Sequence, residues 1–333
     1  MAYTLSLLDK SPVPPDAAGE DALATSVRFA QTAEACGYRR LWLAEHHGAP
    51  GLAGSAPEVL AAYLLAQTSH IRIGTGGILL QHYSPYKVAE IFKVLSALAP
   101  GRIDLGIGKA PGGLPASARA LQSKHRATDL SSFDEQLRDL DDFLSDQIPA
   151  AHPFKDVVAN PQVSTKPERF LLGGSPESAA LAARLGWNFV YAGHFNSDPD
   201  NIERCAGVYG EAAGRSPLLA LYAFAAESTA RAREAVSHVR VFRLTLPDGR
   251  SVNVGSAQQA ADFAQQAGAS EYSLEERNTQ VVAGAPEQVR SQLHEFAHRF
   301  GIEEFVIDTP VADPEARISS IQLIAGQSQT IAA

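Results

Sequence analysis

The sequence is poor in cysteine, in basic residues and in long hydrophobic runs. Its 333 residues include two cysteines, Cys36 and Cys205, so a disulfide framework and a cysteine-rich metal site are both excluded. No apolar stretch approaches the roughly 18 residues that a membrane helix needs. The net charge of −9 argues against nucleic-acid and anionic-membrane partners, which attract basic surfaces. The opening residues, MAYTLSLLDK, lack a basic start, so we expect no signal peptide and a cytoplasmic location.

Several common site motifs are also missing. The run Gly106-Ile107-Gly108 does not continue to a dinucleotide-binding GxGxxG, because Pro111 occupies the sixth position. Neither the phosphate-binding GxxxxGK[ST] loop nor the GxSxG serine elbow occurs. His46 and His47 are adjacent, and adjacent strand residues point to opposite sides, so this pair is a poor metal ligand set. The sequence therefore predicts no metal site.

Short apolar runs alternate with longer amphipathic stretches along the whole chain. Such runs are typical of parallel strands that are buried on both faces. We expect eight strands, at residues 3–8, 40–44, 71–75, 102–107, 169–173, 188–192, 218–225 and 304–308. Eight strand–helix units predict an α/β fold, a (β/α)8 TIM barrel, as one domain over residues 1–333. A doubly wound open sheet is the alternative.

The length in excess of a minimal barrel falls in two insertions. They follow strands 4 and 7, at residues 111–167 and 236–279. The composition of residues 111–113, 123–132 and 251–275 indicates mobility more than chemistry. Between strands, Ser55 and Glu58 have the spacing of a capping box, and Ser175 before Pro176 is a helix N-cap.

Polar residues and glycines gather where the predicted strands end. In a barrel these carboxyl ends carry the active site, and glycines there let a flat ligand approach the backbone closely. The runs at the strand ends include Asp9-Lys10-Ser11, Glu45-His46-His47, Gly76-Gly77, Gly108-Lys109, Gly174-Ser175 and Tyr191-Ala192-Gly193-His194. Glycines that merely end strands are the alternative interpretation.

Five runs, in barrel order, resemble a known family. They are LWLAEHH, IRIGTGG, SPYKVAE, PGRIDLGIGKAPGG and FLLGGSPESAALAARLGW, and they resemble the bacterial luciferase-like flavin-dependent monooxygenases. With the opening SLLDKSPV, the match looks closest to the branch that contains polyketide-tailoring enzymes. The resemblance covers most of the chain and is weakest through the two insertions.

The resemblance implies roles for individual residues. The Gly76-Gly77 peptide falls where relatives have a non-proline cis bond beneath the flavin ring. His46 falls at the catalytic histidine, and Gly174 and Ser175 fall where relatives bind the phosphate of FMN. Lys109 stands where relatives carry arginine, so it keeps the charge but loses bidentate geometry. Tyr191 and His194 are candidates for substrate contacts. The alternatives are a hydrogen-bonded structural role for His46, a solvated Lys109, and helix capping alone for Ser175.

The activity implied is monooxygenation with reduced FMN (FMNH2). A flavin hydroperoxide would transfer one oxygen atom of O2 to a small organic substrate. A separate reductase would supply the reduced flavin, because the chain shows no NAD(P)H fingerprint. Since a histidine titrates near neutral pH, His46 would supply or remove a proton during oxygen transfer. His47, pointing the other way, would serve stability. The alternatives are an F420-dependent hydride-transfer enzyme and a flavin-binding protein without turnover.

The sequence also predicts assembly. Residues 57–68 form a helix that is apolar around most of its circumference, including Val59, Leu60, Tyr63 and Leu64. An outer barrel helix should have one polar face, so a second apolar contact is required. We expect a homodimer through this helix and residues 87–98, as in family members. Coverage by an inserted loop is the alternative.

Overall fold

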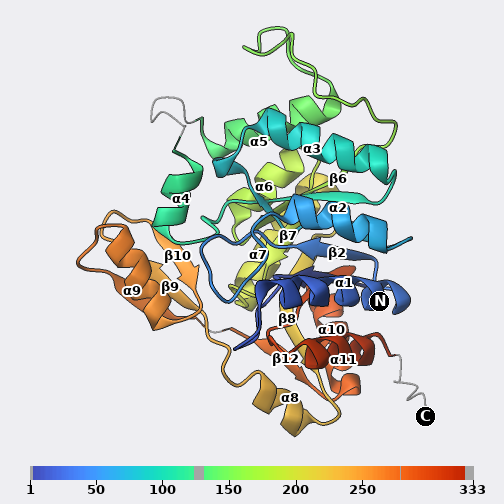
Figure 1. The fold of residues 1–333 in the computed structure, drawn as a ribbon, viewed down its shortest axis with the longest axis vertical. Coiled ribbons are helices and arrows are strands. Elements are labelled where there is room, and N and C mark those ends of the chain that lie inside the picture. The colour runs from blue at the N-terminus through green and yellow to red at the C-terminus, as the bar shows by residue number, and fades with distance from the viewer. Residues whose placement is uncertain (1–2, 124–130, 278, 327–333) are drawn as a thin grey trace.

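The computed structural model describes residues 3–123, 131–277 and 279–326 of the chain. Eight parallel strands form a closed barrel (Figure 1). They are β1 (Thr4–Asp9), β2 (Arg40–Leu43), β3 (Arg72–Thr75), β5 (Ile103–Gly108), β6 (Glu168–Gly173), β7 (Asn188–Ala192), β8 (Leu218–Ala225) and β13 (Glu304–Asp308). Each predicted strand is confirmed to within one residue at either end. Because β1 pairs with β13 and β7 pairs with β8, the sheet has no open edge, and the doubly wound alternative is wrong.

Helices follow the strands and surround the barrel. They are α1 (Gly19–Ala35), α2 (Pro57–Gln67), α3 (Pro85–Leu98), α5 (Phe133–Ser145), α6 (Pro176–Arg184), α7 (Pro199–Ala213), α10 (Pro286–Phe300) and α11 (Pro314–Ala325). The predicted capping box at Ser55 is wrong, because α2 takes Ala56 as its N-cap. Proline at the first helical position fixes the start one residue later than the serine motif indicates.

Two apolar layers hold these elements together. Between strands and helices lies a large cluster that includes Leu7, Leu41, Leu43, Phe189 and Tyr191. The alternate strand residues point into the barrel and form an inner cluster of Leu8, Trp42, Ala44, Phe170, Val190, Leu218, Ala220 and Val306. The period of two along each strand thus sorts side chains into barrel interior and helix interface.

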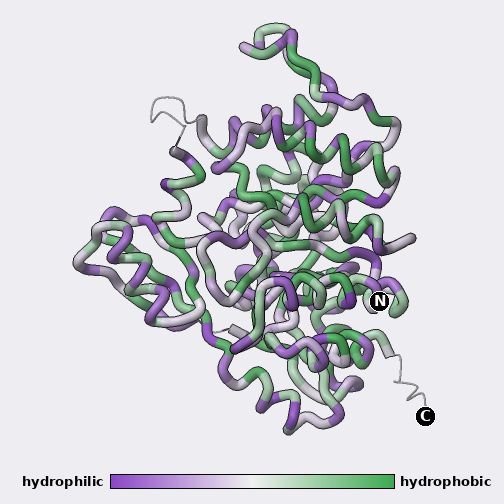
Figure 2. The backbone as a smooth tube through the Cα atoms, viewed as in Figure 1, coloured by the Kyte–Doolittle hydropathy of each residue, from purple (hydrophilic) through white to green (hydrophobic). Residues whose placement is uncertain are grey.

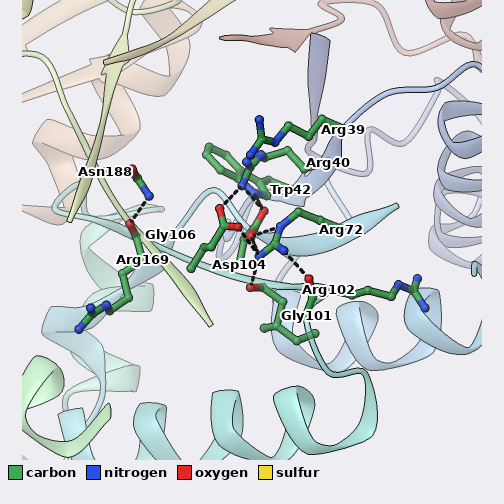
Figure 3. Close-up of polar contacts among 12 residues, drawn as sticks. Arg39, Arg40, Trp42, Arg72, Gly101, Arg102, Asp104, Gly106, Arg169 and Asn188 are labelled. Atoms are coloured by element: carbon green, nitrogen blue, oxygen red, sulfur yellow. Dashed lines mark hydrogen bonds and ion pairs between the residues drawn. The ribbon is translucent and has the colours of Figure 1, made fainter. Parts of the chain in front are cut away.

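The amino-terminal end of the barrel is closed by buried charges (Figure 3). The Arg40 guanidinium donates to Asp104 and to Glu304, at 2.7 Å in each case. Asp104 also accepts from Arg72 at 2.6 Å and from the Trp42 indole at 2.9 Å. All five residues project from the barrel strands β2, β3, β5 and β13. Because every charge has an opposite partner, this end of the barrel is a rigid plug, and ligand chemistry is left to the other end.

The insertion after β8 consists largely of regular helices and strands, although its composition led us to expect mobility. It contains α8 (Thr229–Ala235), a three-stranded antiparallel sheet of β9 (Phe242–Thr245), β10 (Ser251–Val254) and β11 (Ser273–Glu276), and α9 (Ala257–Gln266). β12 (Val281–Gly284) then pairs with β8. Hydrophobic and hydrophilic residues are interspersed along this insertion, as they are along the outer helices of the barrel (Figure 2). The sheet and α9 have their own small apolar cluster, which holds them together.

The insertion after β5 meets the one after β8. It contains α4 (Pro115–Leu121), preceded along the chain by β4 (Ile78–Leu79) and a short 3-10 helix (Leu80–His82) in the loop after β3. α4 lies beside α9 (Figure 1), and Arg119 donates to the Gln266 carbonyl at 3.0 Å. Part of the segment 123–132, also expected to be mobile, lies outside the described residues. None of the described helices is long and apolar enough to cross a membrane.

Candidate active site

A cavity of about 350 Å³ opens at the carboxyl ends of the barrel strands, within the range of small-molecule sites. Its walls come from the ends of β1, β2, β3, β5, β6 and β7 and from the insertion sheet. The lining residues are Leu8, Lys10, Ala44, Glu45, His46, Gly76, Gly77, Leu79, Gly108, Lys109, Ala110, Gly112, Leu172, Gly173, Gly174, Ser178, Ala192, His194, Phe195, Asn196, Arg243, Asn253 and Arg277. Of the sequence candidates, His46, Gly76, Gly77, Lys109, Gly174 and His194 are among them.

The two glycines after β3 form part of the wall. Their peptide bond is cis, in agreement with what the family resemblance implies. A Cβ on Gly77 would lie 2.6 Å from the Gly106 carbonyl oxygen, and one on Gly76 would lie 2.8 Å from Leu8. No other residue type fits without displacing neighbouring backbone or core atoms. The result is a stretch of bare backbone on which a flat ring can lie closely.

His46 lies in the cavity wall, as expected, but its ionisation differs from the expectation. Two residues before it, Ala44 belongs to the inner cluster, so His46 continues the inward-pointing register of β2. Burial, together with the charge of Lys10 and the neighbouring His47, lowers the pKa of His46 to about 4. The prediction that this imidazole titrates near neutral pH is therefore wrong. At neutral pH His46 is an uncharged hydrogen-bonding group.

His194 and Lys10 complete the polar part of the floor. His194 is buried, and its ring lies 4.1 Å from the Phe195 ring and 5.7 Å from the Tyr222 ring. Burial and the charge of Lys10 hold the pKa of His194 well below its usual value. The Lys10 ammonium lies 2.5 Å from the Asp308 carboxylate and donates to the Tyr222 hydroxyl at 3.3 Å. The floor thus carries one fixed positive charge and two neutral imidazoles.

Glu45, which the site prediction left out, organises the wall beside His46. Its Oε1 accepts from the Tyr83 hydroxyl at 2.8 Å and lies 2.7 Å from His47 Nε2, and its Oε2 accepts from the Leu79 amide at 3.0 Å. His47 is absent from the cavity lining, so its predicted orientation away from the mouth is confirmed. The sequence places Glu45 next to His46 at the end of a predicted strand, so Glu45 could have been named as a site residue. Nothing in the local sequence indicated that its partners would be Tyr83 and Leu79.

The rim at β5 and β6 has the chemistry of a phosphate site. Lys109 is exposed, lines the cavity and lies 5.4 Å from the centre of the Phe133 ring. Gly174 leaves open space at the start of α6, and the Ser178 side chain lines the cavity there. Ser175 does not line the cavity. Its hydroxyl accepts from the Ser178 amide at 3.3 Å as the N-cap of α6, so the serine side chain at this rim is Ser178.

Tyr191 is not brought to the cavity. Its ring belongs to the cluster between barrel and helices, and its hydroxyl accepts from Asn201 at 2.7 Å. The neighbouring Val190 points into the barrel, so Tyr191 must point outward. The substrate-contact prediction placed this residue on the wrong face of β7.

Three lining residues that the sequence did not suggest come from the second insertion. Arg243 is on β9, Asn253 is on β10, and Arg277 directly follows β11. They lie far along the chain from the strand ends that they face, and no spacing or motif marks them. Together with Lys10 and Lys109 they give the cavity four cationic side chains against one carboxylate, that of Glu45. The described residues contain no cluster of three or more potential metal ligands.

Comparisons with known proteins agree with this geometry. A family model described as luciferase-like monooxygenase matches residues 1–304. The N-acetyl-S-alkylcysteine monooxygenase of Bacillus subtilis (strain 168) is 41% identical over 324 residues, which make up 96% of each chain. Among solved structures, apo-MsnO8 superposes with a TM-score of 0.75 at 30% identity and covers 98% of this chain and 97% of that one.

More distant structures share the fold alone. The oxygenating constituent of 3,6-diketocamphane monooxygenase from Pseudomonas putida, in complex with FMN, has a TM-score of 0.68 at 19% identity, with 98% of this chain and 97% of that one covered. An F420-dependent secondary alcohol dehydrogenase also has a TM-score of 0.68, at 15% identity, with 98% of this chain and all of that one covered (100%). The first of these proteins holds FMN and the second an F420 adduct.

Proposed function

Because the chain belongs to the luciferase-like monooxygenase family of flavin-dependent monooxygenases, we propose that it oxygenates a small organic substrate with reduced FMN and O2. The observation that carries the proposal is the cavity at the barrel mouth, with a glycine wall and a cationic rim. When bound, reduced FMN would supply two electrons and two hydrogens to the reaction of O2 with the substrate. One oxygen atom would go to the substrate, and the other would leave as water.

The residues present fit FMN. The bare backbone at Gly76 and Gly77 suits one face of a flat ring. Lys109, the Ser178 hydroxyl and the positive end of the α6 dipole suit a phosphate, because a helix N-terminus and an ammonium both stabilise an anion. At neutral pH the uncharged His46 and His194 can accept or donate a hydrogen bond without adding a buried charge. Leu8, Leu79 and Leu172 exclude water from that part of the cavity.

As the substrate class we propose S-alkyl thioethers. The relative that is 41% identical is named for N-acetyl-S-alkylcysteines, and identity at this level extends over almost the whole of both chains. We further propose that a separate reductase supplies the reduced flavin, because the sequence has no dinucleotide-binding GxGxxG run.

We also propose a homodimer through α2 and α3. Val59 and Tyr63 of α2 are 66% and 57% exposed, and Val94 and Leu98 of α3 are 45% and 70% exposed. No insertion in the described part of the chain covers them. Four large apolar side chains in one region of the surface favour contact with a second copy of the chain.

The proposed function is tested by supplying photoreduced FMN, ¹⁸O2 and N-acetyl-S-methylcysteine to the purified protein. Mass spectrometry should find one ¹⁸O atom in the sulfoxide product, with less hydrogen peroxide than in the absence of substrate. Reduction of F420 by a secondary alcohol would favour the hydride-transfer alternative. Rapid oxidation of the flavin without product from any thioether would favour a flavin-binding protein without turnover.

A further inference from the structure

The insertion sheet has two chemically different faces. Side chains alternate along each strand, so Leu244 of β9 and Val252 of β10 share one face. These two residues pair across the strands and pack with Ala260 and Ala264 of α9. The opposite face therefore points away from α9. It carries a cross-strand row in which Arg243, on the central strand, lies between Asn253 and Glu275.

This polar face forms a roof over the cavity. Arg243 and Asn253 line the cavity together with His46 and the Gly76-Gly77 peptide of the barrel. Arg277 lines it as well, and its guanidinium donates to the Asn196 side chain at 3.4 Å. Because Asn196 follows β7, this contact joins the roof to the barrel rim. The cavity thus has barrel strand ends on one side and the insertion sheet on the other.

The positive charge of the roof is poorly balanced. In the described residues the hydrogen-bond partner of the Arg243 side chain is the Ser251 hydroxyl, at 2.9 Å, and Arg243 has no ion pair. Arg277 lies 3.4 Å from Glu275, whose side chain is 68% exposed, so that pair is weak. The Lys10 ammonium on the floor, by contrast, is matched by buried Asp308. Arg243 is exposed and the Arg277 side chain is 24% exposed, so both guanidinium groups are available to an anion that enters the mouth of the cavity.

FMN has one phosphate, and the rim at Lys109 and Ser178 already suits it. The roof arginines come from a different part of the chain and belong to a different wall of the cavity. A second anionic group is therefore expected in the ligand set, and the remaining ligand is the organic substrate. Arginine presents two parallel N–H donors to a carboxylate, which is why guanidinium groups are well suited to this anion.

We propose that Arg243 and Arg277, assisted by the Asn253 amide, bind a carboxylate of the substrate. The enzyme would then act on small organic acids, held by their carboxylate at the insertion sheet while the oxidisable atom reaches the floor near His46. This proposal rests on the proposed function, because it assigns the phosphate end of the cavity to FMN.

The test compares an acid with its uncharged analogue. N-acetyl-S-methylcysteine and its carboxamide are titrated by calorimetry into the protein loaded with oxidised FMN. The acid should bind at least tenfold more tightly than the amide. Arg243→Gln and Arg277→Gln should each remove most of that preference and leave the affinity for FMN within twofold. Arg250→Gln is the matched control, because Arg250 belongs to the same insertion, pairs with Asp248 and does not line the cavity.

Three results would overturn the carboxylate site. The first is equal binding, or no binding, of acid and amide by the wild type. The second is retention of the preference in both variants. The third is a loss of FMN affinity as large as the loss of acid affinity, which would assign the arginines to the phosphate. Failure of the proposed function looks different: the acid still binds with preference, but FMNH2 and O2 yield no oxygenated product.

Discussion

The ammonium of Lys10, which lines the cavity, lies 2.5 Å from the carboxylate of Asp308, at the ends of β1 and β13. Burial alone would lower the pKa of Lys10, but the Asp308 carboxylate and the Tyr222 hydroxyl more than offset it, and the pKa is raised. Lys10 is therefore charged at neutral pH. Its field, in turn, helps to keep His46 and His194 neutral.

Replacing one member of the Lys10–Asp308 pair should destabilise the fold more than replacing both. Lys10→Met should lower the free energy of unfolding by about 3–5 kcal/mol, because the buried Asp308 loses its partner. Asp308→Asn should lower the free energy of unfolding by a similar amount. The double variant should lose less of this free energy than the sum of the losses in the two single variants. Urea unfolding of all four proteins measures this. Additive losses would show that the two groups do not depend on each other.

The neutral histidines predict a dependence of stability on pH. The pKa of His46 is about 4 in the folded protein and roughly 6.5 when unfolded. Between those values the unfolded chain binds a proton that the folded chain does not, so the free energy of unfolding falls as pH falls from 6.5 to 4. The contribution of His46, fully present above pH 6.5, is at most about 3 kcal/mol, and less where solvent reaches the ring.

The buried His194 acts in the same direction. Chemical unfolding is measured at intervals between pH 7.5 and 4. As the pH falls, the free energy of unfolding should decline less steeply for His46→Gln than for the wild type. His70→Gln, which removes an exposed histidine, is the control and should keep the wild-type slope. Identical slopes for His46→Gln and the wild type would contradict the assignment.

Lys109→Ala should weaken FMN binding selectively. The lysine is exposed, so its interaction with a phosphate is partly screened, and a loss of five- to tenfold, about 1 kcal/mol, is expected. Riboflavin has no phosphate and should bind the wild type and the variant equally well. Fluorescence titration of both ligands makes the comparison. A matching loss of riboflavin affinity would mean that Lys109 does not contact the phosphate.

His46→Ala should uncouple flavin oxidation from substrate oxidation. The side chain lies in the cavity wall, and its loss lets water into the reaction site. FMN affinity should stay within roughly tenfold, or 1.4 kcal/mol, while most of the reduced flavin yields hydrogen peroxide. The measured quantity is peroxide released per substrate oxidised, with FMNH2 supplied chemically.

His47→Ala is the matched variant for this experiment. It removes a partner of Glu45 outside the cavity, so it should lower stability by about 1–3 kcal/mol and change the peroxide ratio far less than His46→Ala does. Equal ratios in the wild type and His46→Ala would remove His46 from the mechanism.

Charge on the exposed face of α2 and α3 should separate the dimer. Leu98→Asp and Tyr63→Asp each place a carboxylate in the proposed contact, where its desolvation opposes association. Light scattering over a range of concentrations should show a dimeric mass for the wild type and a monomeric mass for the variants. Phe154→Asp is a control on an exposed apolar residue outside α2 and α3. A wild type that is monomeric at every concentration would refute the dimer.

The local pattern of the sequence determined the barrel strands. Runs such as Leu41-Trp42-Leu43 are apolar at successive positions and short, a pattern typical of a strand that is buried on both faces. Glycines where β3 ends likewise indicated a close approach of the backbone, since no side chain fits at Gly77. Both features leave a local mark in the sequence, an apolar run and a glycine pair, although the contacts that require them come from distant segments such as Gly106 and Leu8.

The tertiary structure alone decided which side chains reach the cavity and in what charge state. Tyr191 was placed on the wrong face because strand register, set by pairing with β6 and β8, fixes which residues point inward. The low pKa of His46 arises from burial and from Lys10, which is 36 positions away along the chain. Arg243 and Arg277 reach the mouth because α9 covers one face of their sheet and leaves the other to the barrel. These are contacts between distant segments, and a residue pattern read along the chain carries no information about which distant segments meet.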